Sequence, residues 1–259
     1  MGMLDGKVAL ISGTGGGMGR AAAIEFVRQG AQVAGCDINA EADRQTAWLA
    51  AEAATAAGSG GRMLSFAPAD LTDPAQAAGF AAAAAAEFGG VDVLYNNASV
   101  ARVGPWDQLD LEEWRRSITY ELDIVYITTK AAWPYLVKRG GGCVINVGSV
   151  SAVRGATFVH QHAHGAAKGG VVAFTRHLMV SGIPHRIRAL SISPGMIRTP
   201  ATAQLPQQVM TELVGKIPSG RAGEPQEVAC LAAFLASDQA TFINGADIAI
   251  DGGCSAVAP

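Results

Sequence analysis

A glycine cluster separates a short apolar run from a helical segment near the start of the chain. The run KVALIS covers residues 7–12, the cluster lies within ISGTGGGMGRAAA, and GRAAAIEFVRQG predicts a helix over residues 19–30. Glycine lets the backbone turn tightly and approach a bound group, and a helix N-terminus offers free N–H donors. A strand, a glycine turn and a helix in this order are typical of domains that bind a dinucleotide pyrophosphate.

Strand-like and helix-like segments alternate through the rest of the chain. Further strands are expected at residues 32–37, 63–70, 91–98, 143–149, 187–195 and 246–253. Helices are expected around Trp48, at residues 74–89, 111–139 (kinked at Pro134) and 225–237, and in the segment that carries Lys168. This alternation favours an α/β Rossmann fold, in which helices cover both faces of a doubly wound parallel sheet of about seven strands. Because no linker or repeat divides residues 1–259, we expect a single domain.

Composition excludes several classes of function. Hydrophobic residues make up 49% of the chain, enough for a substantial core, and the formal net charge is −3. This charge does not favour nucleic-acid binding, and no apolar run reaches membrane-spanning length. The four cysteines form no Cys-x-x-Cys pair, and the N-terminus has no signal-peptide core. We therefore expect reduced thiols, no metal, no membrane partner and a soluble cytoplasmic protein.

An acidic residue, Asp37, ends the second expected strand. A carboxylate at this place can accept hydrogen bonds from both ribose hydroxyls of NAD and repels the 2′-phosphate of NADP. Neither Gly16 nor Ile38 offers a basic group for that phosphate. The alternative role of Asp37 is to cap the following helix, but the pattern favours NAD as the cofactor.

Five motifs extend this pattern along the chain. They are the turn with Gly13, Gly17 and Gly19 (Ser12 replacing a threonine), the pair Asp70-Leu71, the strand end Asn96-Asn97-Ala98-Ser99 (serine replacing a glycine), the segment Ser193-Pro194-Gly195-Met196-Ile197-Arg198-Thr199, and residues 221–253. Together they resemble the short-chain dehydrogenase/reductase family over nearly the whole chain. The resemblance implies a homotetramer built from the long central helices and the C-terminal strand.

The resemblance also implies which residues contact the cofactor. The glycine turn with Met18 would hold the phosphates, Asp70 and Leu71 the adenine, and Lys168 the nicotinamide ribose. The remaining implied contacts are Asn97 and, around the nicotinamide carboxamide, Pro194, Gly195, Ile197 and Thr199.

The chain departs from the family pattern at the active site, which in the family is an Asn-Ser-Tyr-Lys tetrad. Lys168 matches the lysine, but His164 stands where the tyrosine is expected and Glu121 where the helix asparagine is expected. The serine is Ser149 by its place after INVG, whereas the commonest spacing back from His164 gives Ser151. We prefer Ser149, because the strand end anchors the comparison better than the loop that follows it.

A histidine at this place has its own acid–base chemistry. Free imidazole titrates near about 6.5, so it is a base at neutral pH without assistance. The positive charges of Lys168 and an oxidised nicotinamide disfavour imidazolium, which suits alcohol oxidation. Glu121 could stabilise the charged ring directly or through water. Alternatively, Glu121 is a solvated helix residue and His162 or a water carries the proton.

A rival hypothesis is that the missing tyrosine marks a catalytically inactive NAD-binding scaffold or sensor. A zinc site formed by His160, His162 and His164 would need an extended loop and a further carboxylate, so we do not favour it.

The expected substrate is a secondary alcohol or its ketone with some apolar bulk. Substrate contacts are expected from residues 99–106, from the loop at residues 153–162, and from a small helical lid at residues 200–218. The individual candidates are Ser99, Trp106, His162 and Met196. Arg102 and Arg154 could bind an anionic substrate, but exposed arginines are usually solvated, and we favour that interpretation.

Overall fold

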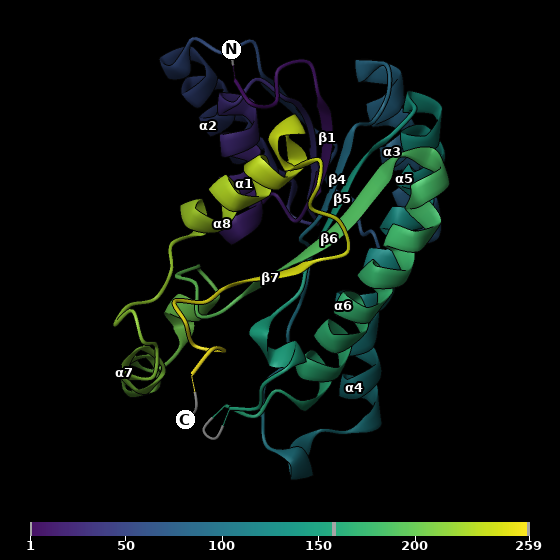
Figure 1. Ribbon diagram of the computed structural model, residues 1–259. Helices are drawn as coiled ribbons and strands as arrows, with labels where there is room; N and C mark the ends of the chain where they lie inside the picture. The colour runs from purple at the N-terminus through teal and green to yellow at the C-terminus, as the bar shows by residue number, and fades with distance from the viewer. Residues whose placement is uncertain (1, 157–158, 258–259) are drawn as a thin grey trace.

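The computed structural model describes residues 2–156 and 159–257, and these residues fold around one parallel sheet (Figure 1). The seven strands are β1 (Val8–Ser12), β2 (Gln32–Cys36), β3 (Arg62–Ser65), β4 (Val93–Asn96), β5 (Gly142–Val147), β6 (Ile187–Pro194) and β7 (Asp247–Ile250). Their order across the sheet is β3-β2-β1-β4-β5-β6-β7, and every neighbouring pair is parallel. The expected doubly wound Rossmann fold is confirmed.

Helices cover both faces of this sheet (Figure 1). One face carries α1 (Gly17–Arg28), α2 (Ala40–Ala57) and α8 (Pro225–Ala236). The other carries α3 (Pro74–Phe88), α4 (Leu111–Ile118), α5 (Ile124–Arg139) and α6 (His162–Gly182), while α7 (Gln207–Gly215) stands apart toward the C-terminus. Short 3-10 turns cover Trp106–Gln108, Val150–Ala152, Ile183–His185, Thr202–Gln204 and Asp238–Ala240. None of the helices in the described part combines the length and the apolar character that crossing a bilayer requires.

The strands alternate their side chains between two buried cores. In β1, Ala9 and Ile11 belong to the core beneath α1 and α8, while Leu10 between them belongs to the core beneath α3 and α5. In β4, Tyr95 and Leu94 divide in the same way. Successive side chains of a strand point to opposite faces, so apolar runs without polar alternation give strands buried on both faces.

Two of the expected elements differ in the structure. The strand expected at residues 63–70 ends at Ser65, and Pro68 beyond it has no N–H to donate to a ladder. The single helix expected at residues 111–139 is interrupted, because Thr119–Asp123 forms a π-helical turn between α4 and α5. α5 then continues through Pro134 to Arg139. A π-turn inserts one extra residue into a helix and is frequent at functional sites.

Candidate active site

The polar strand ends lie along one edge of the sheet. Because all seven strands are parallel, their carboxyl ends share this edge. It carries the glycine turn after β1, Asp37 after β2, Asn97 after β4 and Ser149 after β5. This edge is where an open parallel α/β sheet binds its ligands.

The turn after β1 is shaped for close backbone approach. Gly13 and Gly17 have φ angles of +73° and +52°, which glycine adopts without a steric penalty. A Cβ at Gly13 would lie 2.8 Å from the Cα of Ala98, so a larger residue would push the β4 end away. Gly19 is buried in the first turn of α1, and Met18 packs half-buried against the core. Among the described residues, no side chain caps the N-terminus of α1 at Gly16, so its N–H groups can serve a ligand.

Glu121 and His164 are in direct contact at the same edge. Nδ1 of His164 lies 2.9 Å from each carboxylate oxygen of Glu121, and the Glu121 side chain is fully buried. Ser99 donates from Oγ to Oε1 of Glu121 at 3.2 Å. The π-turn places Glu121, the segment after β4 places Ser99, and the first turn of α6 places His164. Glu121 is therefore not the solvated helix residue of the alternative interpretation.

Lys168 lies one helical turn beyond His164 and is buried. Its Nζ donates to the backbone oxygen of Val147 at the end of β5, at 2.9 Å. Burial lowers the pKa of Lys168, and the charge of Glu121 opposes part of that shift. The amine thus lies beneath the strand ends with a carboxylate near enough to support its positive charge.

The two candidate serines have different partners. The Oγ of Ser149 accepts from the N–H of Ser151 at 3.1 Å, so its own hydroxyl proton stays available for another acceptor. The hydroxyl of Ser151 donates to Oε1 of Gln161 at 2.7 Å, which ties the loop to the start of α6. Of the two hydroxyl protons, that of Ser149 is therefore the one without an acceptor among the described residues.

The segment after β6 returns toward the glycine turn. A Cβ at Gly17 would lie 3.4 Å from the side chain of Thr199, so the two segments are close neighbours. Pro194 ends β6, Gly195 donates to the backbone oxygen of Ile250, and Ile197 is buried. Met196 is half-buried, and its backbone oxygen accepts from Gly223. The segment 200–218 contains the expected helix as α7.

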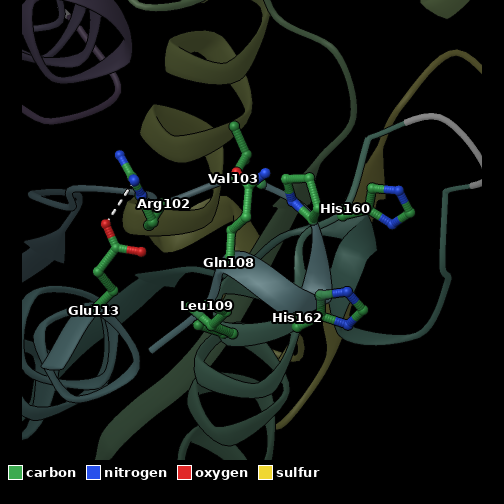
Figure 2. A pocket seen from close by; sticks show the side chains of 10 residues that line it. Arg102, Val103, Gln108, Leu109, Glu113, His160 and His162 are labelled. Atoms are coloured by element: carbon green, nitrogen blue, oxygen red, sulfur yellow. Dashed lines mark ion pairs between the residues drawn. The ribbon is translucent and has the colours of Figure 1, made fainter. Parts of the chain in front are cut away.

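A small cavity of about 160 Å³ opens beside the start of α6 (Figure 2). It is lined by Arg102, Val103, Gly104, Pro105, Gln108, Leu109, Glu113, His160, His162 and Ala163. The rings of His160 and His162 stack with centroids 5.8 Å apart, and Trp106 packs edge-on against His162 at 5.2 Å. Of the four substrate candidates, His162 thus lines the cavity, Trp106 supports it, and Ser99 lies against Glu121. Within residues 2–156 and 159–257, no three metal-ligating side chains come together as a metal site.

Arg102 is exposed, as the favoured interpretation expects, whereas Arg154 is half-buried. Arg102 pairs with Glu113 at 2.6 Å, as the dashed line in Figure 2 marks. Arg154 is half-buried and contacts the backbone oxygen of Cys254, so it fastens the 153–162 loop to the C-terminal segment. Both guanidinium groups have partners that the sequence pattern does not reveal. Thr157 and Phe158 of that loop lie outside the described residues.

Comparisons with known proteins agree on one family. A family model described as enoyl-(acyl carrier protein) reductase matches residues 13–255. D-threitol dehydrogenase of Mycolicibacterium smegmatis is 37% identical over 96% of this chain and 93% of that protein. Trans-4-hydroxycyclohexanecarboxylate dehydrogenase of Sinomonas cyclohexanicum is 39% identical over 95% of this chain and 92% of that protein. A short-chain type dehydrogenase/reductase structure from Mycobacterium marinum superposes with a TM-score of 0.91 at 34% identity, covering 97% of this chain and 96% of that one.

The chain belongs to the short-chain dehydrogenase/reductase family. Membership makes it an oxidoreductase and implies a nicotinamide cofactor, and the sheet edge fits one. The carboxylate of Asp37 accepts from the N–H groups of Gly15 and Asn39 at 2.9 and 2.8 Å, which holds it against the glycine turn. Oδ1 of Asn97 is buried, and the described residues supply it no donor. A buried acceptor without a partner beside a glycine turn suits a ligand hydroxyl.

Asn39, and not Asp37, caps the N-terminus of α2: the Asn39 side chain accepts from the N–H of Ala42.

The two residues expected to contact the adenine have structural contacts of their own. Asp70 accepts from both the N–H and the hydroxyl of Thr72, and Leu71 is buried in the core beneath α3. Thr72 thus holds the Asp70 carboxylate at the sheet edge, and the burial of Leu71 fixes the adjoining backbone.

The buried carboxyl group of Asp43, beneath the glycine turn after β1, was not predicted from the sequence. Asp43 lies in the first turn of α2 and accepts from the hydroxyls of Thr14 and Ser65. Burial raises the pKa of Asp43, those two hydrogen bonds act to lower it, and the charge of Asp37 raises it further. An acidic residue in a first helical turn usually faces solvent and favours the helix dipole, so its sequence position gave no signal. Asp43 supports the glycine turn from below.

Proposed function

We propose that this chain oxidises a secondary alcohol to its ketone with NAD, using His164 in the place of the family's catalytic tyrosine. The observation that carries the proposal is the 2.9 Å contact of His164 Nδ1 with both oxygens of buried Glu121. A histidine whose Nδ1–H is held by a carboxylate presents Nε2 as a base. General-base catalysis of this kind contributes roughly a hundredfold to ten-thousandfold in rate.

Each residue of the set has its own role in the proposed reaction. Nε2 of His164 takes the alcohol proton, and Glu121 stabilises the imidazolium that forms. Ser149 holds the substrate oxygen, and Lys168 binds the nicotinamide ribose. An imidazole projects less far from the backbone than a phenol, so the substrate sits closer to α6 or a water bridges the gap. When bound, the oxidised nicotinamide supplies the hydride acceptor.

The charges near His164 favour oxidation over carbonyl reduction. Lys168 and an oxidised nicotinamide both disfavour a positive charge on the ring, whereas Glu121 favours it. Reduction would need His164 to start as imidazolium, which Glu121 alone supports. We therefore expect oxidation to prevail and reduction to improve as the pH falls.

The cofactor assignment extends to the sheet edge. We propose that Asp37 accepts from the adenosine ribose of NAD and that Asp70 and Leu71 contact the adenine. The phosphates would lie over Gly13, Gly17, Met18 and Gly19, the nicotinamide half against Asn97, Pro194, Gly195, Ile197 and Thr199, and the substrate near His162, Trp106 and Met196. Residues 1–259 would act as one domain.

We further propose a homotetramer that buries apolar side chains now facing solvent. Tyr126 on α5 is 54% exposed and Phe242 before β7 is fully exposed. Exposed aromatic side chains on the long central helices and beside the last strand suit contacts between copies of the chain. Light scattering coupled to size-exclusion chromatography measures the assembly directly.

The test of the catalytic proposal is NADH formation from cyclic, aromatic and aliphatic secondary alcohols, with wild type and His164→Ala side by side. Turnover that collapses in the alanine variant supports the proposal. Equal turnover in both would assign the proton-transfer role to His162, Glu121 or water instead. Binding of NAD without any turnover would favour the rival role as a catalytically inactive scaffold or sensor.

A further inference from the structure

The three residues by which the active-site region departs from the family pattern form one hydrogen-bonded chain. Ser99 stands where that pattern has a glycine, Glu121 where it has an asparagine, and His164 where it has a tyrosine. Ser99 Oγ donates to Glu121 at 3.2 Å, and Glu121 accepts from His164 Nδ1 at 2.9 Å. Three independent amino-acid differences from the family pattern would not be expected to lie in hydrogen-bonding contact with one another.

We propose that Ser99 is a positioning residue that fixes the carboxylate of Glu121 and, through it, the ring of His164. The proposal rests on the proposed function and adds a third member to its proton-transfer set. Ser99 acts through Glu121 and is not assigned a contact with the reacting atoms. It takes this role in place of the substrate contact expected from its sequence position.

Burial explains why Glu121 needs a second donor. Its side chain is fully buried, and a buried carboxylate is costly unless hydrogen bonds satisfy its oxygens. Lys168 contributes charge, but its Nζ donates to Val147. Among the described residues, Ser99 and His164 are the side chains that donate to Glu121. Without the Ser99 hydroxyl, the ring of His164 alone would orient the carboxylate.

The contact with the carboxylate decides which ring nitrogen carries the proton. An ionised carboxylate only accepts, so Nδ1 of His164 must donate to it. Nε2 is then the bare nitrogen of the neutral ring, which is the form that a base needs. A hydrogen-bond partner behind a catalytic ring commonly sets its tautomer in this way. Ser99 therefore contributes by keeping Glu121 in the geometry that selects this tautomer.

Exposure of Ser99 makes the proposal testable by substitution. The residue is exposed in the segment after β4, so Ser99→Ala removes a hydroxyl without opening a core cavity. We expect Ser99→Ala to lower kcat roughly tenfold, as loss of such a partner commonly does, with the KM for NAD little changed. Ser99→Thr keeps the hydroxyl and should retain most of the activity. If Ser99 served packing, the bulkier threonine would do more harm than alanine, and that result would overturn the proposal.

A matched control and a spectroscopic readout complete the test. Ser181→Ala removes another exposed hydroxyl, at the far end of α6, and should leave kcat unchanged. NMR of isotope-labelled histidine, with His164 assigned by the loss of its signals in His164→Ala, should show the Nδ1–H form in wild type and a tautomer mixture in Ser99→Ala. An unchanged ring spectrum and unchanged kcat in Ser99→Ala would overturn the inference. If wild type oxidises no alcohol but the ring spectrum still responds to Ser99→Ala, the proposed function fails and the positioning role stands.

Discussion

Nδ1 of His164 lies 2.9 Å from both carboxylate oxygens of Glu121, although 43 residues separate them along the chain. The contact is part-buried, with the Glu121 side chain fully enclosed, and it joins the π-turn before α5 to the first turn of α6. In a low-dielectric site, a carboxylate stabilises a charged ring far more than it does in water.

Replacing Glu121 by glutamine should slow alcohol oxidation. The amide keeps the shape but cannot stabilise the imidazolium that forms when His164 takes the proton, so we expect kcat/KM to fall roughly 10- to 100-fold. Steady-state rates from about pH 5 to about pH 9 measure the effect.

A matched control separates this effect from a general loss of charge. Glu112→Gln removes an exposed carboxylate on α4 and should leave rate and profile unchanged. A Glu121→Gln variant with a wild-type rate and profile would contradict the assigned role.

Restoring tyrosine at residue 164 alone should not restore the usual chemistry. A phenol reaches farther than imidazole and would meet the buried carboxylate of Glu121, whose negative charge disfavours phenolate. We expect His164→Tyr to be less active than wild type and the double variant His164→Tyr/Glu121→Asn to be more active than His164→Tyr. NADH formation across a pH series compares the three proteins. A fully active single variant would show that Glu121 and residue 164 are independent.

Asp37 should set the choice between NAD and NADP. Its carboxylate is held at the glycine turn by the N–H groups of Gly15 and Asn39, where it would repel a 2′-phosphate. Asp37→Ser should lower the ratio of kcat/KM for NAD over NADP at least about tenfold, which corresponds to about 1.4 kcal/mol. Asp73→Ser, at the N-cap of α3, is the control. An unchanged ratio in Asp37→Ser would contradict the assignment of NAD.

Asp43 should make the stability of the cofactor-free protein fall as pH rises. Burial raises the pKa of Asp43 in the folded protein, so the folded state holds the proton to higher pH than the unfolded state does. The contribution is most favourable below the ordinary pKa of 3.8 and is lost as pH rises through the folded value. Asp43→Asn, neutral throughout, should therefore lose less stability relative to wild type at neutral than at acid pH. Urea unfolding at both pH values measures the difference, and a difference that does not change with pH would contradict the buried charge.

The thiols should differ sharply in reactivity. Burial raises the pKa of Cys143 to about 11 and that of Cys36 further, whereas Cys230 is exposed. Only the thiolate is nucleophilic, so a disulfide reagent should modify Cys230 in the folded protein and spare Cys36 and Cys143. Mass spectrometry of labelled peptides reads the sites, with Cys230→Ser as the control. Rapid labelling of Cys143 without denaturant would contradict its burial.

Sequence patterns sufficed for the elements that rest on local signals. Apolar runs such as residues 7–12 and the glycine turn after them predict strand, turn and helix from neighbours in the chain. The π-turn at Thr119–Asp123 was not predictable, because its residues also suit an α-helix. The link between Ser99 and Glu121 spans 22 residues and depends on how β4 and the π-turn meet. Contacts of this kind require the packed fold.

The π-turn between α4 and α5 makes the active site sensitive to chain length. One residue of an α-helix corresponds to about 100° of rotation. Deleting a single residue from Thr119–Asp123 would let α4 and α5 merge into one regular helix, and the side chains on either side of the deletion would rotate against each other by that amount. The side chain of Glu121 could then no longer face Ser99 and His164. The position of the carboxylate thus depends both on the glutamate at residue 121 and on the extra residue that the π-turn inserts into the helix.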